Sequence, residues 1–376
     1  MNILYLGDIN SVHDFKWVSY FSVQKKHTVF FVTESENYDL LSSDRKAVLE
    51  EANIIVLPPI FNFSLFNLFK SYKSIRLLRK YIRNYNIDIF HVLFGSPQAI
   101  WLNFFSKKTK KVITTRGSDV LVLLRSVCES SGIKNKILKW LLISGYKKAD
   151  YIASTSDVQI SFLQSIGVNS SKNQLIKTGV DVKKIIEQNP LEKVNTKKEK
   201  FVFSARYISE VYNMEYQIEA IKGLPKNILE DFSFLFVKKP GDDSKYFQGV
   251  IAQLEAIKDL QFDVCENLTQ PQMWATLKSS QLTYMVPKSD GTPNTALECM
   301  AMKTPLIMGD LDYNYELFDG VSLVADLSQS KSLTDQIVVG LTNYPQKYLE
   351  VGFNKVSKFG SRETEMSKLE RIYESL

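Results

Sequence analysis

Two short apolar runs near the start of the chain, NILYLG at residues 2–7 and HTVFFVT at residues 27–33, decide the fold class. Each has the length and composition of a buried strand, and residues 13–26 between them have the pattern of a helix. A strand, a helix and a second strand in this order predict a parallel sheet with a right-handed crossover. The sequence therefore predicts an α/β fold.

The same alternation continues outward from this start through the whole chain. In the first half, strands are predicted at residues 52–57, 88–93, 111–115 and 150–154, the last strand of that half, with helices at 65–85 and 158–167. In the second half, strands are predicted at 200–204, 232–237, 260–264, 282–286, 305–308 and 322–324. Residues 344–376 are predicted to be helical, with a break at 359–361.

A polar, lysine-rich stretch, EQNPLEKVNTKKEK at residues 187–200, separates the two halves and predicts a linker. We therefore predict an N-terminal domain at 1–186, the linker at 187–200, a C-terminal domain at 201–355 and a final helix at 356–376. Doubly wound sheets bind ligands at the carboxyl ends of their strands. A cleft between two such ends, if they face each other, is the expected site.

Composition and charge narrow the class of protein. The chain has 376 residues, of which 44% are hydrophobic and 23% charged, which excludes a disordered or fibrous protein. Residues 1–190 carry 26 Lys and Arg against 15 Asp and Glu, whereas the remainder carries 21 against 26. The basic half predicts an anionic partner, either a phosphorylated substrate or an anionic membrane surface. Because the cations do not form an arginine-rich aromatic stripe, nucleic acid is not expected.

Cysteines and the N-terminus bear on localisation. The three cysteines are far apart in sequence and predict no disulfide framework, which favours a reducing cytoplasm. The N-terminus, MNILYLGDIN, runs directly into a strand and predicts no signal peptide. No run of 18 apolar residues predicts a membrane span.

The richest stretch for chemistry is VPKSDGTPNTALECMAM at residues 286–302. A strand ends at Val286, a turn with Gly291 follows, and a helix is predicted to begin near Asn294. Backbone N–H groups at such a helix start, reinforced by the helix dipole, bind anions. Asp290 and Glu298 flank this cradle and are placed to accept hydrogen bonds from sugar hydroxyls. Ordinary helix capping by Asp290 is the alternative interpretation.

The stretch SDGTPNTALECMAMKTPLI at residues 289–307 resembles the signature of retaining GT-B glycosyltransferases of the family-4 type: an acidic residue, seven residues, Glu, a helix of small residues and PLI. Further segments match in order: LGDINSVHDFKW at 6–17, DIFHVLFGS at 88–96, TTRGSDVL at 114–121, ADYIASTS at 149–156, IKTGVDVKKI at 176–185 and FSARYISEVYNMEYQIEAI at 203–221. The resemblance implies two Rossmann-like domains that face each other across a cleft, with the C-terminal helix crossing back to the N-terminal domain.

The resemblance also implies roles for particular residues. Glu298 matches the residue that binds the nucleotide ribose, Asp290 the acid that contacts the donor sugar, and Arg206 the cation that pairs with the diphosphate. The amides that hold the diphosphate match Gly291, Thr292, Pro293, Asn294 and Thr295. His13 matches the first-loop histidine, and together with Asp119 it joins Asp290 and Arg206 as a catalytic candidate. The acceptor side is expected to include Asn10, Ser11, His13, His91 and Arg116.

Three positions depart from the family pattern. The lysine that usually follows the arginine is absent from residues 209–212, so Lys238 or Lys239 would have to replace it. Arg116, followed by Gly117, stands where many members carry His-Gly; it is suited to bind an anionic acceptor or sugar, with Asp119 orienting a hydroxyl. The first acid of the signature is Asp290 where Glu is commoner.

The function implied by the resemblance is transfer of a sugar, with retention of configuration, from a UDP-sugar to a glycan, lipid-linked or protein acceptor in bacterial surface glycan synthesis. No metal and no cofactor are expected, because the helix start and Arg206 would stabilise the leaving diphosphate. Basic helical segments with Lys70 to Arg83 and Lys134 to Lys148 are placed either to hold a cytoplasmic protein on the inner face of the membrane or to form a solvated face. A nucleotide-sugar 2-epimerase, and a GT-B-like protein without turnover that binds a partner, are the alternatives.

Overall fold

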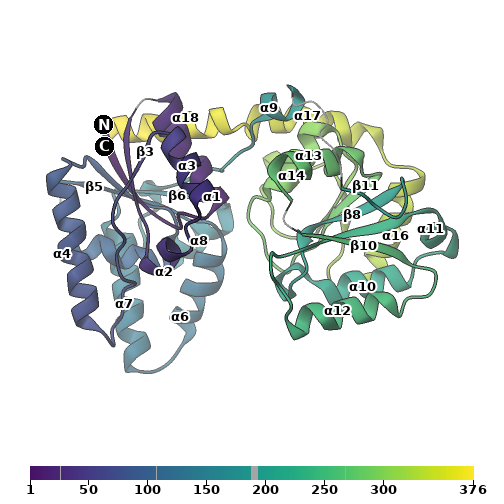
Figure 1. The fold of residues 1–376 in the computed structure, drawn as a ribbon, viewed down its shortest axis with the longest axis horizontal. Helices are drawn as coiled ribbons and strands as arrows, with labels where there is room; N and C mark the ends of the chain where they lie inside the picture. Colours follow the sequence, from purple (N-terminus) through teal and green to yellow (C-terminus); the bar gives the residue numbers. More distant parts are fainter. Residues whose placement is uncertain (26, 107, 188–193, 267) are drawn as a thin grey trace. The chain divides into compact units, whose positions relative to one another are not determined.

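The computed structural model describes residues 1–25, 27–106, 108–187, 194–266 and 268–376 (Figure 1). The chain divides into two compact units. Unit 1 contains residues 1–178 and 365–376, and unit 2 contains residues 179–364. Of the predicted linker at 187–200, residues 188–193 lie outside the described part of the chain.

Unit 1 is built on a parallel sheet of seven strands in the order β3-β2-β1-β4-β5-β6-β7. The strands are β1 (Asn2–Leu6), β2 (Thr28–Val32), β3 (Ile54–Val56), β4 (Ile89–Val92), β5 (Lys110–Thr114), β6 (Tyr151–Ser154) and β7 (Asn173–Leu175). The helices are α1 (Val12–Ser19), α2 (Ser35–Asp39), α3 (Ser43–Glu51), α4 (Leu68–Asn84), α5 (Gly95–Gln98), α6 (Arg125–Glu129), α7 (Ile133–Lys148) and α8 (Asp157–Ser165), with shorter π or 3₁₀ segments η1 (Tyr20–Gln24), η2 (Ala99–Phe104), η3 (Asp119–Leu124) and η4 (Ser170–Lys172).

Unit 2 is built on a parallel sheet of six strands in the order β10-β9-β8-β11-β12-β13. The strands are β8 (Phe201–Tyr207), β9 (Ser233–Lys238), β10 (Gln261–Glu266), β11 (Leu282–Met285), β12 (Leu306–Gly309) and β13 (Leu323–Ala325). The helices are α9 (Val182–Glu187), α10 (Met214–Lys222), α11 (Lys226–Asp231), α12 (Lys245–Glu255), α13 (Gln270–Ser279), α14 (Asn294–Met302), α15 (Tyr315–Phe318), α16 (Ser330–Thr342) and α17 (Gln346–Phe359), with the 3₁₀ turn η5 (Glu210–Tyr212).

Both sheets are buried on both faces, which explains why their strands are continuous apolar runs in the sequence. Along β1, Leu4 and Leu6 pack into one apolar cluster while Ile3 and Tyr5 pack into another, because successive side chains point to opposite faces. In unit 2, Phe234 and Phe236 of β9 face one cluster and Leu235 faces the other. The predicted α/β architecture with two doubly wound domains is confirmed.

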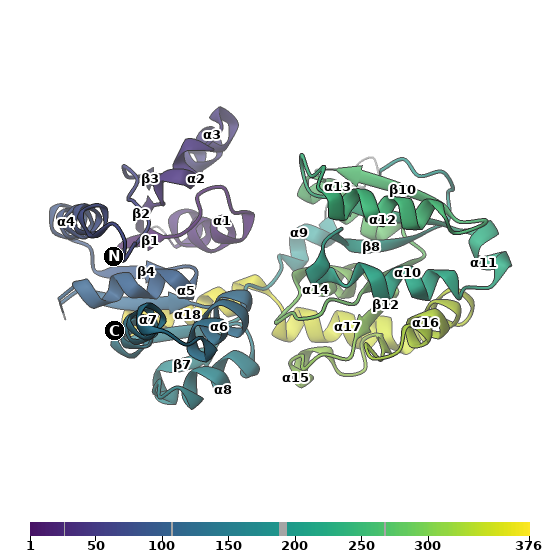
Figure 2. The same cartoon turned by 90° about the horizontal axis from the view of Figure 1, so that it is seen from below.

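The last helix, α18 (Arg362–Ser375), packs from residue 365 onward within unit 1. Its buried residues Met366, Leu369 and Tyr373 join the cluster on one face of the β1 sheet. The carboxylate of Glu365 accepts a hydrogen bond from the backbone N–H of Lys177 at 2.8 Å. The prediction that the final helix returns to the N-terminal domain is therefore confirmed (Figure 2).

Two local predictions are wrong. The strand at 150–154 is not the last of the first half, because β7 follows it at the sheet edge. β7 is only three residues long, with the sequence NQL, and therefore lacks the apolar run of the other strands. Its first residue, Asn173, accepts a hydrogen bond from the Ser154 hydroxyl at 2.7 Å. The helix predicted over 13–26 is α-helical only to Ser19 and then continues as the π-helical η1.

Candidate active site

The site candidates of unit 2 come together where the strand order of its sheet reverses. β8 and β11 are neighbours in the sheet, but the chain passes through β9 and β10 on one side before it returns to β11. The loops that leave β8 and β11 therefore lie side by side at the carboxyl edge, which is where sheets of this type bind ligands. A backbone hydrogen bond from Lys288 to Val211, at 2.9 Å, joins the two loops.

Arg206 and Asp290 form an ion pair across this switch point. The Nη2 group of Arg206, at the end of β8, donates to Oδ2 of Asp290 at 2.6 Å, and each side chain is 20% exposed. The guanidinium also lies 5.6 Å from the ring centre of Tyr212. Burial lowers the pKa of Arg206, but the negative charges of Asp290 and Glu298 and the neighbouring tyrosines outweigh it, so the pKa is raised overall. Arg206 thus carries a permanent positive charge at the switch point of unit 2.

The turn from Asp290 to Thr295 leads into α14, as predicted. Pro293 is the N-cap residue of α14, and its side chain has no oxygen or nitrogen with which to cap the helix. The other carboxylate oxygen of Asp290 accepts the backbone N–H of Gly291 at 2.8 Å. Gly291, Pro293 and Thr295 are buried, whereas Thr292 and Asn294 are half-buried. The helix start therefore presents the positive end of its dipole beside Arg206.

Glu298 lies one turn into α14 and is only 4% exposed. Its Oε1 atom accepts a hydrogen bond from Nε2 of Gln270 at 2.9 Å, which fixes the carboxylate against α13. Glu298 is also among the charges that raise the pKa of Arg206, so the two side chains are electrostatic neighbours. Arg206, Asp290 and Glu298 are thus brought together within unit 2.

Tyr313, in the loop after β12, belongs to the same cluster but was not singled out from the sequence. Burial raises the pKa of its hydroxyl, with a further increase from Asp290 and a decrease from Arg206. Its oxygen is buried without a hydrogen-bond partner among the described residues, and so is Nε of Arg206. Buried polar atoms are normally paired, so two adjacent unpaired ones indicate a place for a ligand. The signal in the sequence was a tyrosine just after the strand next to β11.

Lys238, a candidate replacement for the absent lysine, is already engaged elsewhere. Its ammonium pairs with Asp243 at 2.9 Å and Glu266 at 3.8 Å, at the end of β9.

Unit 1 has a comparable switch point between β1 and β4, and Arg116 lies there. Its Nη2 group donates to Oδ1 of Asp14 at 2.8 Å, and its Nε group donates to the carbonyl of Leu93 at 3.1 Å. The guanidinium lies over the ring of Trp17 at 5.3 Å. Burial lowers the pKa of Arg116 and raises the pKa of Asp14 to about 6, although each charge favours the other.

Three other acceptor-side candidates lie on the first loop and on α1 of unit 1. Ser11 is the N-cap of α1, and its hydroxyl accepts the backbone N–H of Asp14 at 3.2 Å. Asn10 is half-buried and donates from Nδ2 to the carbonyl of Asn37 at 2.7 Å. His13 is exposed in the first turn of α1.

Asp119, a catalytic candidate from the sequence, is buried in unit 1. Its carboxylate has no exposed surface and accepts three backbone N–H groups, those of Gly95 at 2.7 Å and of Arg116 and Gly117 at 2.9 Å each. Burial raises its pKa against these hydrogen bonds. Asp119 thus joins the segments after β4 and β5 and positions Arg116, and its catalytic role stays a prediction.

His91 is buried in the sheet of unit 1, although the sequence predicts it on the acceptor side. It lies on β4 with no exposed surface, where Nε2 is 2.8 Å from the Thr114 hydroxyl and Nδ1 is hydrogen-bonded to the hydroxyl of Tyr373 on α18. Burial, with a smaller effect of Arg116, lowers the pKa of His91 well below its usual range. His91 thus connects the sheet to α18, and its place on the acceptor side stays a prediction.

The described residues contain neither a metal-binding cluster nor a membrane-spanning helix. No group of three or more His, Cys, Asp or Glu side chains in the described residues is arranged to hold a metal ion. Within the same residues, no helix combines the length and apolarity that crossing a bilayer requires.

Comparisons with known proteins agree with this architecture. The family described as Glycosyltransferase Family 4 matches residues 23–184, and the family described as Glycosyl transferases group 1 matches residues 185–337. No curated protein matches the sequence significantly.

Solved structures resemble the whole chain. A glycosyltransferase from Rickettsia africae is 15% identical, with a TM-score of 0.76 over 100% of this chain and 98% of that one. HepE of Anabaena in complex with UDP is 13% identical, with a TM-score of 0.76 over 100% of both chains. Sucrose-phosphate synthase of Thermosynechococcus elongatus is 13% identical, with a TM-score of 0.74 over 100% and 98%. At these identities the likeness establishes the fold, and the two family matches establish the kinship. The chain therefore belongs to the group 1, family-4-type glycosyltransferases and has their GT-B fold.

Proposed function

We propose that this glycosyltransferase takes its sugar from a UDP-sugar and retains the configuration at the anomeric carbon. The observation that carries the proposal is the Arg206–Asp290 pair, which lies beside the start of α14 at the switch point of unit 2. A permanent guanidinium and a helix dipole are the elements that bind a diphosphate. Choice of UDP rests on the similar Anabaena protein, which has been solved with UDP and with UDP-glucose.

Donor binding would rearrange the pair. Arg206 now donates to Asp290, so the donor's phosphate oxygens would compete for that guanidinium and for the Gly291 N–H. Release of the Asp290 carboxylate would free it to accept a hydrogen bond from a sugar hydroxyl. Glu298, already fixed by Gln270, would accept hydrogen bonds from the ribose. Diphosphate and sugar would thus be held by separate parts of one cluster.

In the transfer step, the bond between the anomeric carbon and the leaving phosphate oxygen breaks while the acceptor oxygen bonds to that carbon from the same face. The acceptor proton passes to the leaving phosphate oxygen. Arg206 and the start of α14 stabilise the charge that develops on the diphosphate, so no protein nucleophile is needed. We propose that these groups act without a metal ion.

We further propose that unit 1 binds the acceptor near Arg116, Asn10, Ser11 and His13, and that the acceptor is a glycan, a lipid-linked sugar or a protein in bacterial surface glycan synthesis. The work would take place in the cytoplasm, on the inner face of the membrane. The excess of cations in residues 1–190 supports an anionic acceptor or surface.

The test is a thermal-shift panel with UDP, GDP and ADP and their glucose conjugates, followed by an assay of UDP release. A nucleotide at 100 times its dissociation constant stabilises the binding unit by about 2.7 kcal/mol. Glu298→Gln should weaken UDP binding about 10- to 100-fold, because a hydrogen bond to a charged group is lost. Arg206→Lys keeps the charge but loses the planar fork, and it should weaken UDP binding as well. Glu255→Gln, an exposed carboxylate of α12, is the matched control.

The outcomes separate the alternatives. Full UDP affinity in Glu298→Gln would refute the site. Binding of a UDP-sugar without transfer or UDP release to any acceptor would favour a binding protein, and formation of the 2-epimer would favour an epimerase. Activity should persist in EDTA; a complete loss that Mn²⁺ restores would contradict the metal-free mechanism.

A further inference from the structure

Helix α7 carries an apolar stripe that the described residues of its unit leave exposed. Ile133, Ile137 and Trp140 are 77%, 45% and 67% exposed. Their spacing of four and three residues places them on one face of the helix. The opposite face, with Leu141, Leu142 and Tyr146, is the one that packs into the core. The residues of the exposed stripe therefore do not contribute to the core of unit 1.

A second group of exposed apolar side chains lies at the start of α4. Phe66, Leu68, Phe69 and Tyr72 are 83%, 65%, 67% and 60% exposed. Lysines lie over these rings: the ammonium of Lys73 is 4.4 Å from the ring centre of Phe69, and that of Lys134 is 4.5 Å from the ring centre of Phe66. Because Lys134 belongs to α7, the second contact joins the two groups.

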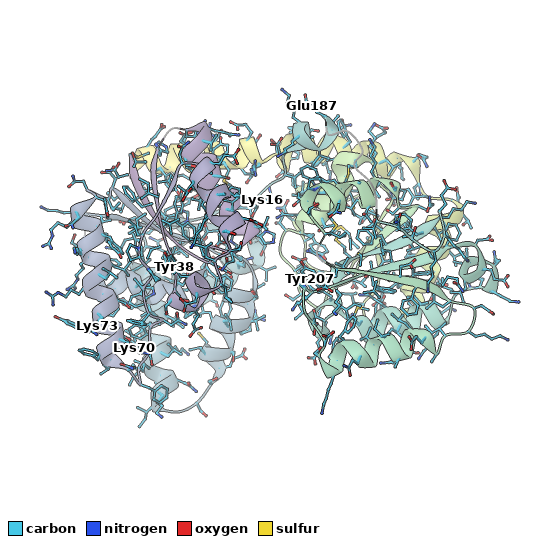
Figure 3. The ribbon with its side chains drawn as sticks, in the orientation of Figure 1. Lys16, Tyr38, Lys70, Lys73, Glu187 and Tyr207 are labelled. Atoms are coloured by element: carbon cyan, nitrogen blue, oxygen red, sulfur yellow. The ribbon has the colours of Figure 1, made fainter. Side chains whose placement is uncertain are left out.

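The two helices begin at the same end of unit 1, at the lower end in Figure 1. Lys70 and Lys73 lie at this end of α4 (Figure 3). We call the exposed side chains of this end the aromatic–lysine surface, made up of Phe66, Leu68, Phe69, Lys70, Tyr72, Lys73, Ile133, Lys134, Ile137 and Trp140.

The excess positive charge of residues 1–190 is concentrated in the two segments that carry the aromatic–lysine surface. Residues 58–87 and 130–149 contain 11 Lys and Arg and no Asp or Glu. The rest of residues 1–190 contains 15 cations and 15 acids, so these two segments account for the whole excess of 11. Glu129 at the end of α6 and Asp150 directly flank the second segment in the sequence. The surface therefore combines exposed hydrocarbon with undiluted positive charge.

That combination fits the interface of an anionic bilayer. Aromatic rings favour the headgroup level, aliphatic side chains enter the acyl boundary, and lysines reach lipid phosphates. A second copy of the chain fits less well, because a symmetric dimer would place this cationic surface against itself. Nucleic acid would satisfy the lysines but leave Leu68, Ile133 and Ile137 without an apolar partner.

We propose that the aromatic–lysine surface docks unit 1 on an anionic lipid bilayer. The proposal deepens the membrane location proposed above, by naming the residues that make the contact. Docking is measured without donor, acceptor or transfer, so its failure would leave the transferase assignment standing, and a failed transfer assay would leave docking intact.

The test is flotation of the full chain with vesicles of phosphatidylcholine alone and with a third of phosphatidylglycerol. Binding is expected only with the anionic vesicles and should weaken as salt is raised. Trp140 supplies a second readout, because Trp17, Trp101 and Trp274 are at most 8% exposed. A blue shift of the fluorescence, and quenching by brominated acyl chains, should accompany flotation.

Matched variants separate the charge from the apolar contribution. Lys73→Gln with Lys134→Gln should weaken binding about 25-fold, about fivefold per lysine. Phe69→Ser should weaken it about 10-fold or more, through lost apolar burial. Lys258→Gln with Lys331→Gln, exposed lysines of unit 2, and Leu40→Ser, which is 75% exposed, are the controls and should bind as the wild type does.

Three results would overturn the proposal. They are equal binding to neutral vesicles, no loss in either set of surface variants, and a dimer in sedimentation that the Phe69→Ser variant dissolves. Binding of RNA that competes with vesicles and survives Phe69→Ser would assign the surface to nucleic acid instead.

Discussion

Each unit carries an arginine–aspartate pair at the switch point of its sheet, and the two pairs differ in how completely they are satisfied. In unit 1, Arg116 bonds to Asp14 and also to the carbonyl of Leu93, and the two side chains are 14% and 8% exposed. In unit 2, Arg206 bonds to Asp290 while its Nε atom and the nearby Tyr313 hydroxyl are buried without a partner. The first pair completes the protein's own hydrogen bonds, whereas the second leaves some for a ligand.

This difference teaches that Arg116 is held in place by the protein's own groups, whereas Arg206 keeps an unpaired donor beside the start of α14. Burial raises the pKa of Asp14 and lowers that of Arg116, so the pair in unit 1 is held against the preference of both groups. The pKa of Arg206 is raised by the acids around it. The position of Arg116 in unit 1 therefore depends on the surrounding hydrogen bonds, above all on the three that Asp119 accepts from backbone N–H groups.

The largest expected contrast is in the loss of unfolding free energy caused by Asp119→Asn in unit 1 and by Asp290→Asn in unit 2. Asp119→Asn should lower the unfolding free energy of unit 1 by about 3–5 kcal/mol, because it disrupts three buried charge-assisted hydrogen bonds and the support of Arg116. Asp290→Asn should lower that of unit 2 by no more than about 1 kcal/mol, because its pair is partly exposed. Urea unfolding followed by fluorescence measures both.

Tryptophan positions allow the units to be followed separately. Trp17 and Trp101 are buried in unit 1, and Trp274 is buried in unit 2, so a Trp274→Phe background reports on unit 1 alone. Equal losses in the two variants would show that the support of Arg116 by Asp119 contributes no more to folding than the Arg206–Asp290 pair does, and would end the contrast.

The next contrast is in the pH dependence of unit 1. Since burial raises the pKa of Asp14 from 3.8 to about 6, the folded chain binds this proton more tightly than the unfolded chain between those values. The unfolding free energy should therefore fall by about 3 kcal/mol as the pH rises from about 4 to above 6. Asp14→Asn should remove this slope, although it also leaves Arg116 without its partner.

Urea midpoints measured from pH 4.5 to 7.5 give the slope. Glu34, whose pKa is raised to about 7 by burial and by Glu36 and Asp8, adds a slope of the same sign in both proteins, so the difference between wild type and variant is the readout. A variant with the wild-type slope would show that Asp14 is ionised throughout this range.

The strands were predictable because a parallel sheet covered on both faces requires continuous apolar runs. The run from Phe232 to Val237 predicts β9 to within one residue at each end. β7 was not predictable in this way, because its Asn173 is buried through a side-chain hydrogen bond to Ser154 and not through apolar packing. The pattern of apolar residues in the sequence therefore predicts the central strands of a sheet better than the strands at its edge.

The cluster of unit 2 was predictable because Arg206 and Asp290 follow strands that become neighbours. The burial of Asp119 and His91 was not predictable, because the groups that pair with them come from distant segments: Gly95 at the start of α5, and Tyr373 from 282 residues further along the chain. A polar residue just after a strand looks the same in the sequence whether it faces solvent or accepts buried amides. Only the packing of distant segments separates the two cases.

The smallest expected effect concerns Tyr313, the residue of the cluster that sequence reasoning missed. Its hydroxyl has no partner among the described residues, so Tyr313→Phe should change the stability of unit 2 by less than about 1 kcal/mol. If the hydroxyl pairs with bound donor, the variant should bind the UDP-sugar about five- to tenfold more weakly. Tyr284→Phe, a buried tyrosine of β11 in the core of the same unit, is the control.

The ratio of UDP-glucose affinity to UDP affinity, measured by calorimetry, separates two places for the contact. A loss confined to UDP-glucose would place the hydroxyl on the sugar beside Asp290, whereas an equal loss for both ligands would place it on the diphosphate beside Arg206. Unchanged affinity for both would mean that the unpaired hydroxyl of Tyr313 is tolerated in the fold without a ligand. The contrast between the two switch points would then rest on Arg206 alone.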